Sequence, residues 1–187
     1  MKVRVALPSD AQEIAALHAA SWRYAYRGAL SEEYLAGDIL AERSAVWTDR
    51  FQCAPPNQYV VVAEIESQII GFACAYANED AQWGTLLDNI HVSQSVQRQG
   101  VGLKLMAAVG QWCELTAPAS GLFLWVLQSN LPAQRFYEGL GAVNVGADVW
   151  FSPDGGSVPT YQYTWQNIQV LLQNCASQEK LKRQTGS

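Results

Sequence analysis

The sequence predicts an α/β fold in which a mixed, largely antiparallel sheet of about seven strands is flanked by about four helices. Short runs rich in β-branched and aromatic residues alternate with segments of helical periodicity along the chain. Clusters of Pro, Gly, Asp and Ser separate these runs, as turns do. The run from Leu122 to Leu127 is continuously apolar, which is typical of a strand buried on both faces. The resulting order is βααββββαβαββ with residues 81–92 counted as two strands, and one strand fewer with these residues counted as one.

The first half of the chain predicts a strand, two helices and an antiparallel hairpin. Its helices follow from apolar residues at helical spacing, which begin after the turn and cap at Pro8-Ser9-Asp10. The hairpin follows from two β-rich runs separated by residues 66–68. The expected elements are a strand over residues 2–7, a helix that ends at Gly28, a helix from Ser31 to Pro55, and strands over 59–65 and 69–76.

The second half predicts alternating strands and helices that close with a second hairpin. The strong turn signal Pro153-Asp154-Gly155-Gly156 joins the two strands of that hairpin. The expected elements are strands over residues 86–92 and 122–127, helices over 100–115 and 131–140, and hairpin strands over 143–151 and 158–165. We expect residues 1–166 to form one domain and the polar residues 167–187 to form a short C-terminal helix with a frayed tail.

Composition excludes several classes of protein. With 49% hydrophobic and 16% charged residues, the chain has enough apolar surface for one compact core and is not of the disordered class. Its net charge of −5 argues against nucleic acid as a partner, because such proteins carry a basic stripe. An acidic body instead favours a cationic acceptor such as an amine. The composition leaves a homodimer open.

Cysteine, histidine and hydropathy patterns indicate a reduced, metal-free protein. The four cysteines lie far apart with no CxxC pair, and two histidines are too few for an evident zinc site. No uncharged apolar run approaches the length of a membrane span, and the N-terminus lacks the apolar core of a signal peptide. We therefore expect a soluble, cytoplasmic protein without a metal or a membrane partner.

The most informative segment is residues 87–106, where a strand passes through a polar loop into a helix that begins with Gly100 and Gly102. Two glycines at this spacing let the backbone turn tightly and approach a ligand, while the unpaired amides of the first helical turn bind phosphate. The dinucleotide fingerprint GxGxxG fails because Leu105 occupies the place of its third glycine, and the phosphate loop GxxxxGK[ST] is absent. The pattern therefore disfavours a Rossmann enzyme or an NTPase.

Two motifs in this sequence resemble those of the GNAT superfamily of N-acetyltransferases. Gln97-Arg98-Gln99-Gly100-Val101-Gly102 is similar to its [RQ]-x-x-G-x-[GA] loop, which binds the pyrophosphate of coenzyme A. The segment from Asn130 to Ala142 resembles its Asn-x-x-Ala-x-x-Phe-Tyr-x-x-x-Gly-Phe motif, with Ala142 in place of the final aromatic residue. The resemblance covers about residues 1–166 and implies an acetyl-CoA-dependent enzyme with the GNAT fold.

The resemblance also implies a set of residues that bind acetyl-CoA as cosubstrate. Gly100 and Gly102 would otherwise mark a turn and a close helix contact, and Asn130 could cap the helix that follows it, with or without a cofactor contact. The implied cofactor-binding residues are Ile90, His91, Val92, Gln97, Arg98, Gln99, Gly100, Val101, Gly102, Leu103, Lys104, Asn130, Ala133 and Tyr137.

Tyr137 is the expected catalytic acid. The resemblance implies that it protonates the departing CoA thiolate, and a phenol of pKa about 10 can assist a thiol of pKa about 8.5. The structural alternative is a ring in the core with its hydroxyl group at the surface.

Asp88 is the expected base by its position on the strand before the loop. Two-residue alternation places it on the same face as Ile90 and Val92, beside the expected path of pantetheine, with His91 on the other face. A solvated aspartate is a weak base, so the role needs burial or a relaying water, and an ion-paired Asp88 is the structural alternative. Other branches of the family carry a catalytic Glu where this chain has Leu86. His91 is a second candidate, with Glu79 and Asp80 as reserves.

The acceptor site is the least determined part of the prediction. The resemblance places one wall of it at Trp22 and Tyr26, which at a spacing of four residues could also form a helix stripe in the core. The aromatic cluster favours a primary amine of a small molecule, acetylated by direct attack in a ternary complex. Protein N-terminal or lysine acetylation and a non-catalytic CoA-binding module are the alternatives.

Overall fold

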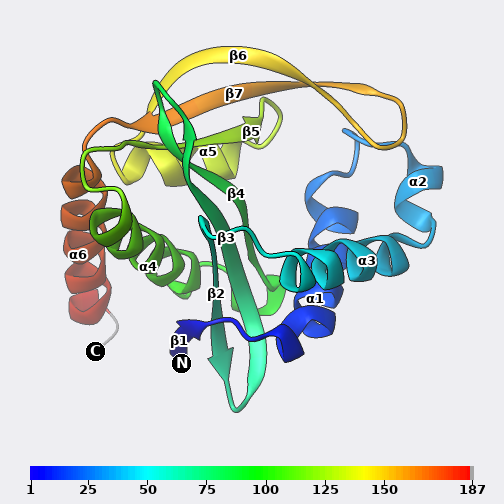
Figure 1. Cartoon of the computed structure of the whole chain (residues 1–187), viewed down its shortest axis with the longest axis horizontal. Coiled ribbons are helices and arrows are strands. Elements are labelled where there is room, and N and C mark those ends of the chain that lie inside the picture. The colour runs from blue at the N-terminus through cyan, green and yellow to red at the C-terminus, as the bar shows by residue number, and fades with distance from the viewer. Residues whose placement is uncertain (186–187) are drawn as a thin grey trace.

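A computed structural model describes residues 1–185 and forms one seven-stranded sheet in the order β1-β2-β3-β4-β5-β7-β6 (Figure 1). Neighbouring strands pair antiparallel except β4 and β5, which are parallel. The mixed, largely antiparallel sheet predicted from the sequence is therefore confirmed. The strands are β1 (Lys2–Val5), β2 (Gln58–Ile65), β3 (Gln68–Asp80), β4 (Gly84–Val92), β5 (Leu122–Leu127), β6 (Val143–Phe151) and β7 (Ser157–Trp165).

More helices surround the sheet than the sequence pattern predicted. The single helix expected from Ser31 to Pro55 is two, because Gly37 is extended and the Asp38 side chain then accepts a hydrogen bond from the Ala41 amide to start a new helix. The helices are α1 (Ala11–Ala25), α2 (Glu32–Ala36), α3 (Ile39–Gln52), α4 (Val101–Thr116), α5 (Leu131–Gly139) and α6 (Ile168–Thr185), with 3₁₀ turns at Pro8–Asp10 and Gln94–Val96.

Helices cover both faces of the sheet, and alternate residues of the central strands face each group. On β2, Val60 and Val62 pack with α1 and α3, whereas Val61 and Ala63 pack with α4. Figure 1 shows α1 and α3 on one side of the sheet and α4 with α6 on the other. Two separate apolar clusters result, with the sheet between them.

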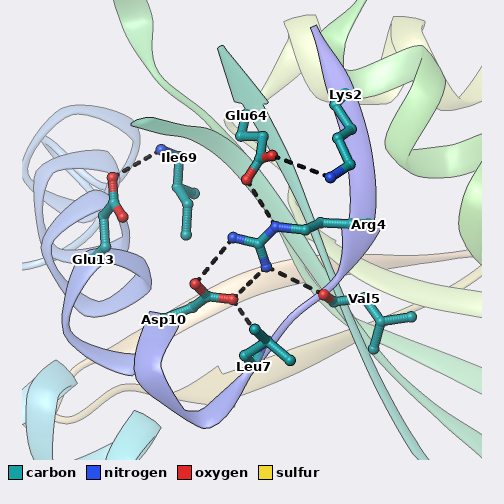
Figure 2. Close-up of polar contacts among 8 residues, drawn as sticks. All are labelled: Lys2, Arg4, Val5, Leu7, Asp10, Glu13, Glu64 and Ile69. Carbon is teal, nitrogen blue, oxygen red and sulfur yellow. Dashed lines mark hydrogen bonds and ion pairs between the residues drawn. The ribbon is translucent and has the colours of Figure 1, made fainter. Parts of the chain in front are cut away.

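A charged network fixes the start of the chain against the sheet (Figure 2). Arg4 on β1 donates to Asp10 at 2.6 Å and to Glu64 on β2 at 2.7 Å. The hydrogen bond from Arg4 lowers the pKa of Asp10, because it stabilises the carboxylate. Glu13, one turn into α1, accepts from the amide of Ile69 on β3. These contacts therefore fix the N-terminal end of α1 to the strands β1, β2 and β3. The same helix carries residues of the site further along.

The C-terminal helix belongs to the fold. The sequence predicted a short helix with a frayed tail, but α6 is 18 residues long and buries Leu171 and Cys175 in the same core as α4. Residues 186 and 187, the end of the expected tail, lie outside the described residues. Within residues 1–185 no helix is both long and apolar enough to cross a membrane, and no group of three metal-ligating side chains occurs.

The two parallel strands at the centre of the sheet separate along their length. β4 and β5 pair at Thr85 with Leu122 and at Leu86 with Phe123, and no pair of these strands follows within the described residues. Beyond this point β4 continues to Val92 and β5 to Leu127 without each other as partners. The divergence opens the middle of the sheet and positions the site described next.

Candidate active site

A cavity of about 1150 Å³ begins where β4 and β5 diverge. Its wall includes both diverging strands, the loop before α4, the first turns of α4 and α5, and parts of α1, α3, β6 and α6. This volume exceeds the roughly 300–1,000 Å³ of a typical single-ligand pocket. The cavity is therefore large enough to hold two substrates together.

The loop before α4 presents main-chain amides at one end of the cavity. Gly100 has φ of +89° and Arg98 has φ of +63°, so the chain reverses sharply before the helix. Gly100 is the helix cap and has no side chain to accept from the first amides, and the amide of Lys104 makes the first helical hydrogen bond, to the Gly100 carbonyl at 3.2 Å. The amides of residues 101–103 are thus available for an anion at the positive end of α4.

Most residues predicted to bind the cofactor line this cavity. The exceptions are Gln99, whose side chain donates to the carbonyl of Ser95, and Lys104, whose amide is used within the helix. Asn130 also lines the cavity, and its side chain accepts from the Ala133 amide at 3.2 Å, so the predicted capping role is confirmed. The predicted residues found in the wall are Ile90, His91, Val92, Gln97, Arg98, Gly100, Val101, Gly102, Leu103, Asn130, Ala133 and Tyr137.

The geometry of this end fits the phosphates of coenzyme A. Gly102 lines the cavity, and a Cβ atom there would meet Phe136 at 3.5 Å and Val92 at 3.8 Å, which are ordinary contacts. Lys182 on α6 donates to the Arg98 carbonyl at 3.3 Å and so places an ammonium group beside the loop. The sequence pattern missed Lys182, because it lies 84 residues along the chain from Arg98.

Tyr137 lies in the middle of the cavity wall on α5. Its ring is 7% exposed and packs edge-on against Trp165, with centroids 6.1 Å apart. Burial raises the pKa of Tyr137, and nearby Tyr26 raises it further, so the phenol stays protonated at neutral pH. Among the described residues its hydroxyl has no hydrogen-bond partner. The buried ring fits the structural alternative considered from the sequence, and the role of Tyr137 as catalytic acid stays a prediction.

The structure corrects the predicted direction of Asp88. Cys74 on β3 pairs with Asn89 and Ala75 pairs with Leu87, which leaves Asp88 unpaired in a β-bulge. The extra residue shifts the alternation, so Asp88 does not share a face with Ile90 and Val92, which pack toward α4.

Asp88 instead joins the face that α3 covers. Arg50 on α3 bonds both Asp88, at 2.8 Å, and Asn89, at 2.7 Å. The carboxylate still lines the cavity, in an ion pair. Taking up a proton would break that pair, so Asp88 is a poor direct base.

His91 shares this face instead of opposing Asp88. Its ring lies 4.6 Å from that of His18 on α1 and 5.3 Å from Phe72. Burial lowers the pKa of His91 to about 4, so its imidazole is neutral at pH 7. Glu79 and Asp80 lie outside the cavity wall, and Asp80 accepts from the amides of residues 82 and 83 in the turn before β4.

Aromatic side chains form the other end of the cavity. The rings of Trp22 and Tyr26 are tilted against each other with centroids 5.0 Å apart, and Trp150 on β6 completes the cluster at 6.0 Å from Trp22. Trp22 is 6% exposed and packs in the core, as one alternative from the sequence had it, and it also lines the cavity, while its place in the acceptor site stays a prediction. Burial, together with the nearby Asp88 carboxylate, raises the pKa of Tyr26 to about 12.

The charge of the cavity differs from that of the whole chain. Although the chain carries −5, basic side chains outnumber acidic ones in the described wall. The basic residues are Arg27, Arg43, Arg50, Arg98 and Lys182, and the acidic ones are Asp88 and Asp148. The net charge of the whole chain therefore did not predict the charge of the cavity wall, which favours anionic groups. The sequence pattern singled out none of these arginines except Arg98.

The fold places a large cavity where the sheet opens, and comparison with known proteins identifies the family. The acetyltransferase (GNAT) family model matches residues 14–142, more than half of the chain. The chain belongs to the GNAT family and is an N-acetyltransferase.

Relatives and solved structures agree with this assignment. The chain is 30% identical to the N-acetyltransferase YuaI of Bacillus subtilis over 149 residues, covering 78% of this chain and 82% of the relative. A GNAT-family structure from Desulfovibrio desulfuricans shares the fold with a TM-score of 0.68 at 20% identity, over 89% of this chain and 98% of the other. The PaiA N-acetyltransferase of Thermoplasma acidophilum, solved with coenzyme A, has a TM-score of 0.65 at 19% identity, over 86% and 96% of the two chains.

Proposed function

We propose that this enzyme transfers the acetyl group of acetyl-CoA to the primary amine of a small molecule, by direct attack in a ternary complex. The observation that carries the proposal is the single cavity, which joins the amides at the start of α4, the hydroxyl of Tyr137 and the aromatic cluster around Trp22. Such an arrangement lets a donor and an acceptor enter from two ends and meet beside Tyr137.

The donor end acts through main-chain groups. The amides of residues 101–103 bind the pyrophosphate, and the unpaired edges of β4 and β5 accommodate the pantetheine chain between the strands. Acetyl-CoA supplies an activated thioester, so the protein mainly has to align the reactants and stabilise the developing oxyanion. A main-chain N–H of β4 near His91 or Val92 is the oxyanion donor in this proposal.

Tyr137 serves as the acid. The amine nitrogen forms a bond to the acetyl carbon as the carbon–sulfur bond breaks, and Tyr137 gives its proton to the sulfur. Its raised pKa keeps the phenol protonated until that moment. No covalent enzyme intermediate is needed, so the kinetics are those of a ternary complex.

The acceptor amine loses its proton to water held by Asp88. An amine of pKa about 10.4 pays roughly 4.6 kcal/mol to be neutral at pH 7, so a route for the proton matters. Because Arg50 holds the carboxylate, a bridging water that Asp88 orients is a better acceptor than the carboxylate itself. Neutral His91 is the alternative relay on the same face.

An acceptor screen tests the proposal. Purified enzyme with acetyl-CoA is offered small amines, aminoglycosides and peptides, and released thiol is measured. We expect release with a small amine and intersecting lines in initial-velocity plots. Release with peptides alone would favour protein acetylation, parallel lines would indicate a covalent intermediate, and binding of acetyl-CoA without turnover of any acceptor would indicate a CoA-binding module. A Bacillus anthracis protein assigned as a streptothricin acetyltransferase, 26% identical over 59% of this chain and 63% of its own with a TM-score of 0.52, makes antibiotics sensible members of the screen.

A further inference from the structure

Three buried N–H groups at the aromatic end of the cavity have no hydrogen-bond partner among the described residues. They are Nε2 of His18, Nε1 of Trp22 and Nε of Arg43. The three side chains are at least nine-tenths buried, with exposures of 1%, 6% and 8%, and all line the cavity. Buried donors are nearly always paired in folded proteins, so three orphans in one wall indicate an acceptor that the protein itself does not supply.

The three donors lie close together. His18 and Trp22, one turn apart on α1, are in edge contact with ring centroids 5.4 Å apart. The guanidinium carbon of Arg43 on α3 lies 4.3 Å from the centre of the Trp22 ring. Trp22 therefore contacts both of the other side chains that carry an unpaired donor.

His18 is fixed as a neutral donor. Its Nδ1 accepts from Nε1 of Trp47 at 3.0 Å, so the ring proton is on Nε2, the atom without a partner. Burial lowers the pKa of His18, with further lowering by His91 and Arg43, so the ring does not add a charge. The donor set is thus two neutral N–H groups and one guanidinium.

The positive charge beside the His18 and Trp22 donors comes from Arg43 and not from Arg50. Both side-chain bonds of Arg50 go to Asp88 and Asn89. One terminal nitrogen of Arg43 pairs with Glu42, whose other oxygen accepts from the Tyr34 hydroxyl. Glu42 therefore offsets part of the Arg43 charge and leaves its Nε free of a partner.

We propose that His18, Trp22 and Arg43 form a carboxylate-binding subsite, so that the acceptor is a primary amine that also carries a carboxylate, as an amino acid does. Three N–H groups from planar side chains match the lone pairs of a carboxylate. A singly charged carboxylate suits the partly offset Arg43 better than a doubly charged phosphate ester. The inference rests on the proposed acetyl transfer and names its substrate class.

The subsite is next to the expected reaction centre. The rings of Trp22 and Tyr26 lie 5.0 Å apart between centroids, and Tyr26, Asp88 and Tyr137 line the same cavity. A short molecule can therefore place its carboxylate at the subsite and its amine near the acetyl group.

Matched acceptors test the subsite. Each amino acid that releases thiol is compared with its amide, its decarboxylated amine and its phosphonate analogue. We expect kcat/KM for the amino acid to exceed that for the amide by at least about 10-fold, mainly through KM. Equal rates for acid, amide and decarboxylated amine would overturn the proposal, and a preference for the phosphonate would show that the subsite takes a phosphate-like anion instead.

Variants locate the effect in the three donors. Trp22→Phe keeps an aromatic side chain, although a smaller one, and removes the N–H, and Arg43→Gln removes the charge. Both should reduce the preference for acid over amide by about 10-fold while the dissociation constant of acetyl-CoA stays the same. Arg135→Gln, an exposed arginine outside the cavity wall, is the control. If Arg43→Gln fails to fold, Trp22→Phe alone tests the subsite. An unchanged preference of Trp22→Phe for acid over amide would overturn the carboxylate-binding subsite.

Binding without turnover separates this proposal from the proposed function. The complex of the enzyme with CoA is titrated by calorimetry with N-acetylated amino acids and with their amides. Tighter binding of the acids, lost in Trp22→Phe, supports the subsite even if no acceptor tested releases thiol. Equal binding of acids and amides would overturn the subsite while leaving acetyl transfer to amines intact.

Discussion

The two ends of the cavity are built in different ways. In the proposed site, the donor end uses main-chain amides from one continuous segment, residues 101–103, and its geometry depends on the backbone at Gly100. The acceptor end uses side chains from separate elements, such as His18 on α1, Arg43 on α3 and Trp150 on β6. A site made of backbone needs a local conformation, whereas a site made of side chains needs the whole fold to bring them together.

This difference sets which end can change without losing the reaction. Substituting a side chain at the acceptor end should alter which amine is used and leave donor binding intact. Substituting at the donor end should weaken every reaction equally, because all acceptors share one donor. Tyr137 lies between the two ends and should affect the chemical step alone.

The largest effect is expected at that boundary. Tyr137→Phe removes the hydroxyl but keeps the buried ring, so kcat should fall by roughly 10²-fold while affinity for CoA is nearly unchanged. Thiol release at saturating substrates measures kcat, and calorimetry measures the affinity. Tyr161→Phe, a partly buried ring outside the cavity wall, is the matched control. Full turnover by Tyr137→Phe would remove the catalytic role.

At the donor end, Gly102→Val tests whether the backbone itself binds the pyrophosphate. A Cβ atom at this position makes ordinary contacts with Phe136 and Val92, so the variant should fold. The added methyl groups should hinder the approach of the phosphates and weaken acetyl-CoA binding by about 10-fold or more.

The control for this variant is Gly146→Ala on β6, where a Cβ atom meets no other atom within 4 Å and which lies outside the cavity wall. Calorimetric titration with acetyl-CoA compares the two proteins. Parent-like affinity of Gly102→Val would show that the phosphates bind elsewhere, and the distinction between a backbone end and a side-chain end would then fail.

The same distinction explains what the sequence could predict. The donor loop and the Asn130 cap depend on residues a few positions apart, so their spacing was informative. The sheet and its buried β5 strand followed from periodicity. The contacts between distant elements did not, because no local pattern shows that Arg43 lies over the Trp22 ring at the acceptor end or that Lys182 reaches the Arg98 carbonyl at the donor end.

For Asp88, the two-residue alternation of a strand predicted the wrong face, because β4 contains a bulge. Alternation assigns a face only while each residue pairs in turn, and the bulge between Leu87 and Asn89 inserts one extra residue. The sequence around Asp88 contains no Gly or Pro to mark the bulge. The sequence analysis selected Asp88 as the candidate base but assigned its side chain to the wrong face of β4.

Asp88→Asn tests the route of the amine proton. The amide cannot orient or accept as the carboxylate does, so kcat/KM at neutral pH should fall by about 10-fold. The loss should shrink as the pH rises toward the pKa of the amine, because the acceptor is then neutral without help. Asp49→Asn, an exposed acid of α3 outside the cavity wall, is the control. A profile of equal height and shape to that of the parent would assign the proton to water or to His91.

The smallest effect is expected from Lys182, a cation that α6 brings to the donor end. Lys182→Ala removes an exposed ammonium group beside the Arg98 carbonyl, so acetyl-CoA affinity should fall by only about 3-fold, as for exposed ion pairs generally. The loss should disappear in high salt, which screens such pairs. Lys180→Ala, an exposed lysine outside the cavity wall and two residues earlier on the same helix, should bind acetyl-CoA like the parent. A loss much larger than 3-fold that persists in salt would show that the donor end, too, depends on a side chain delivered by the fold.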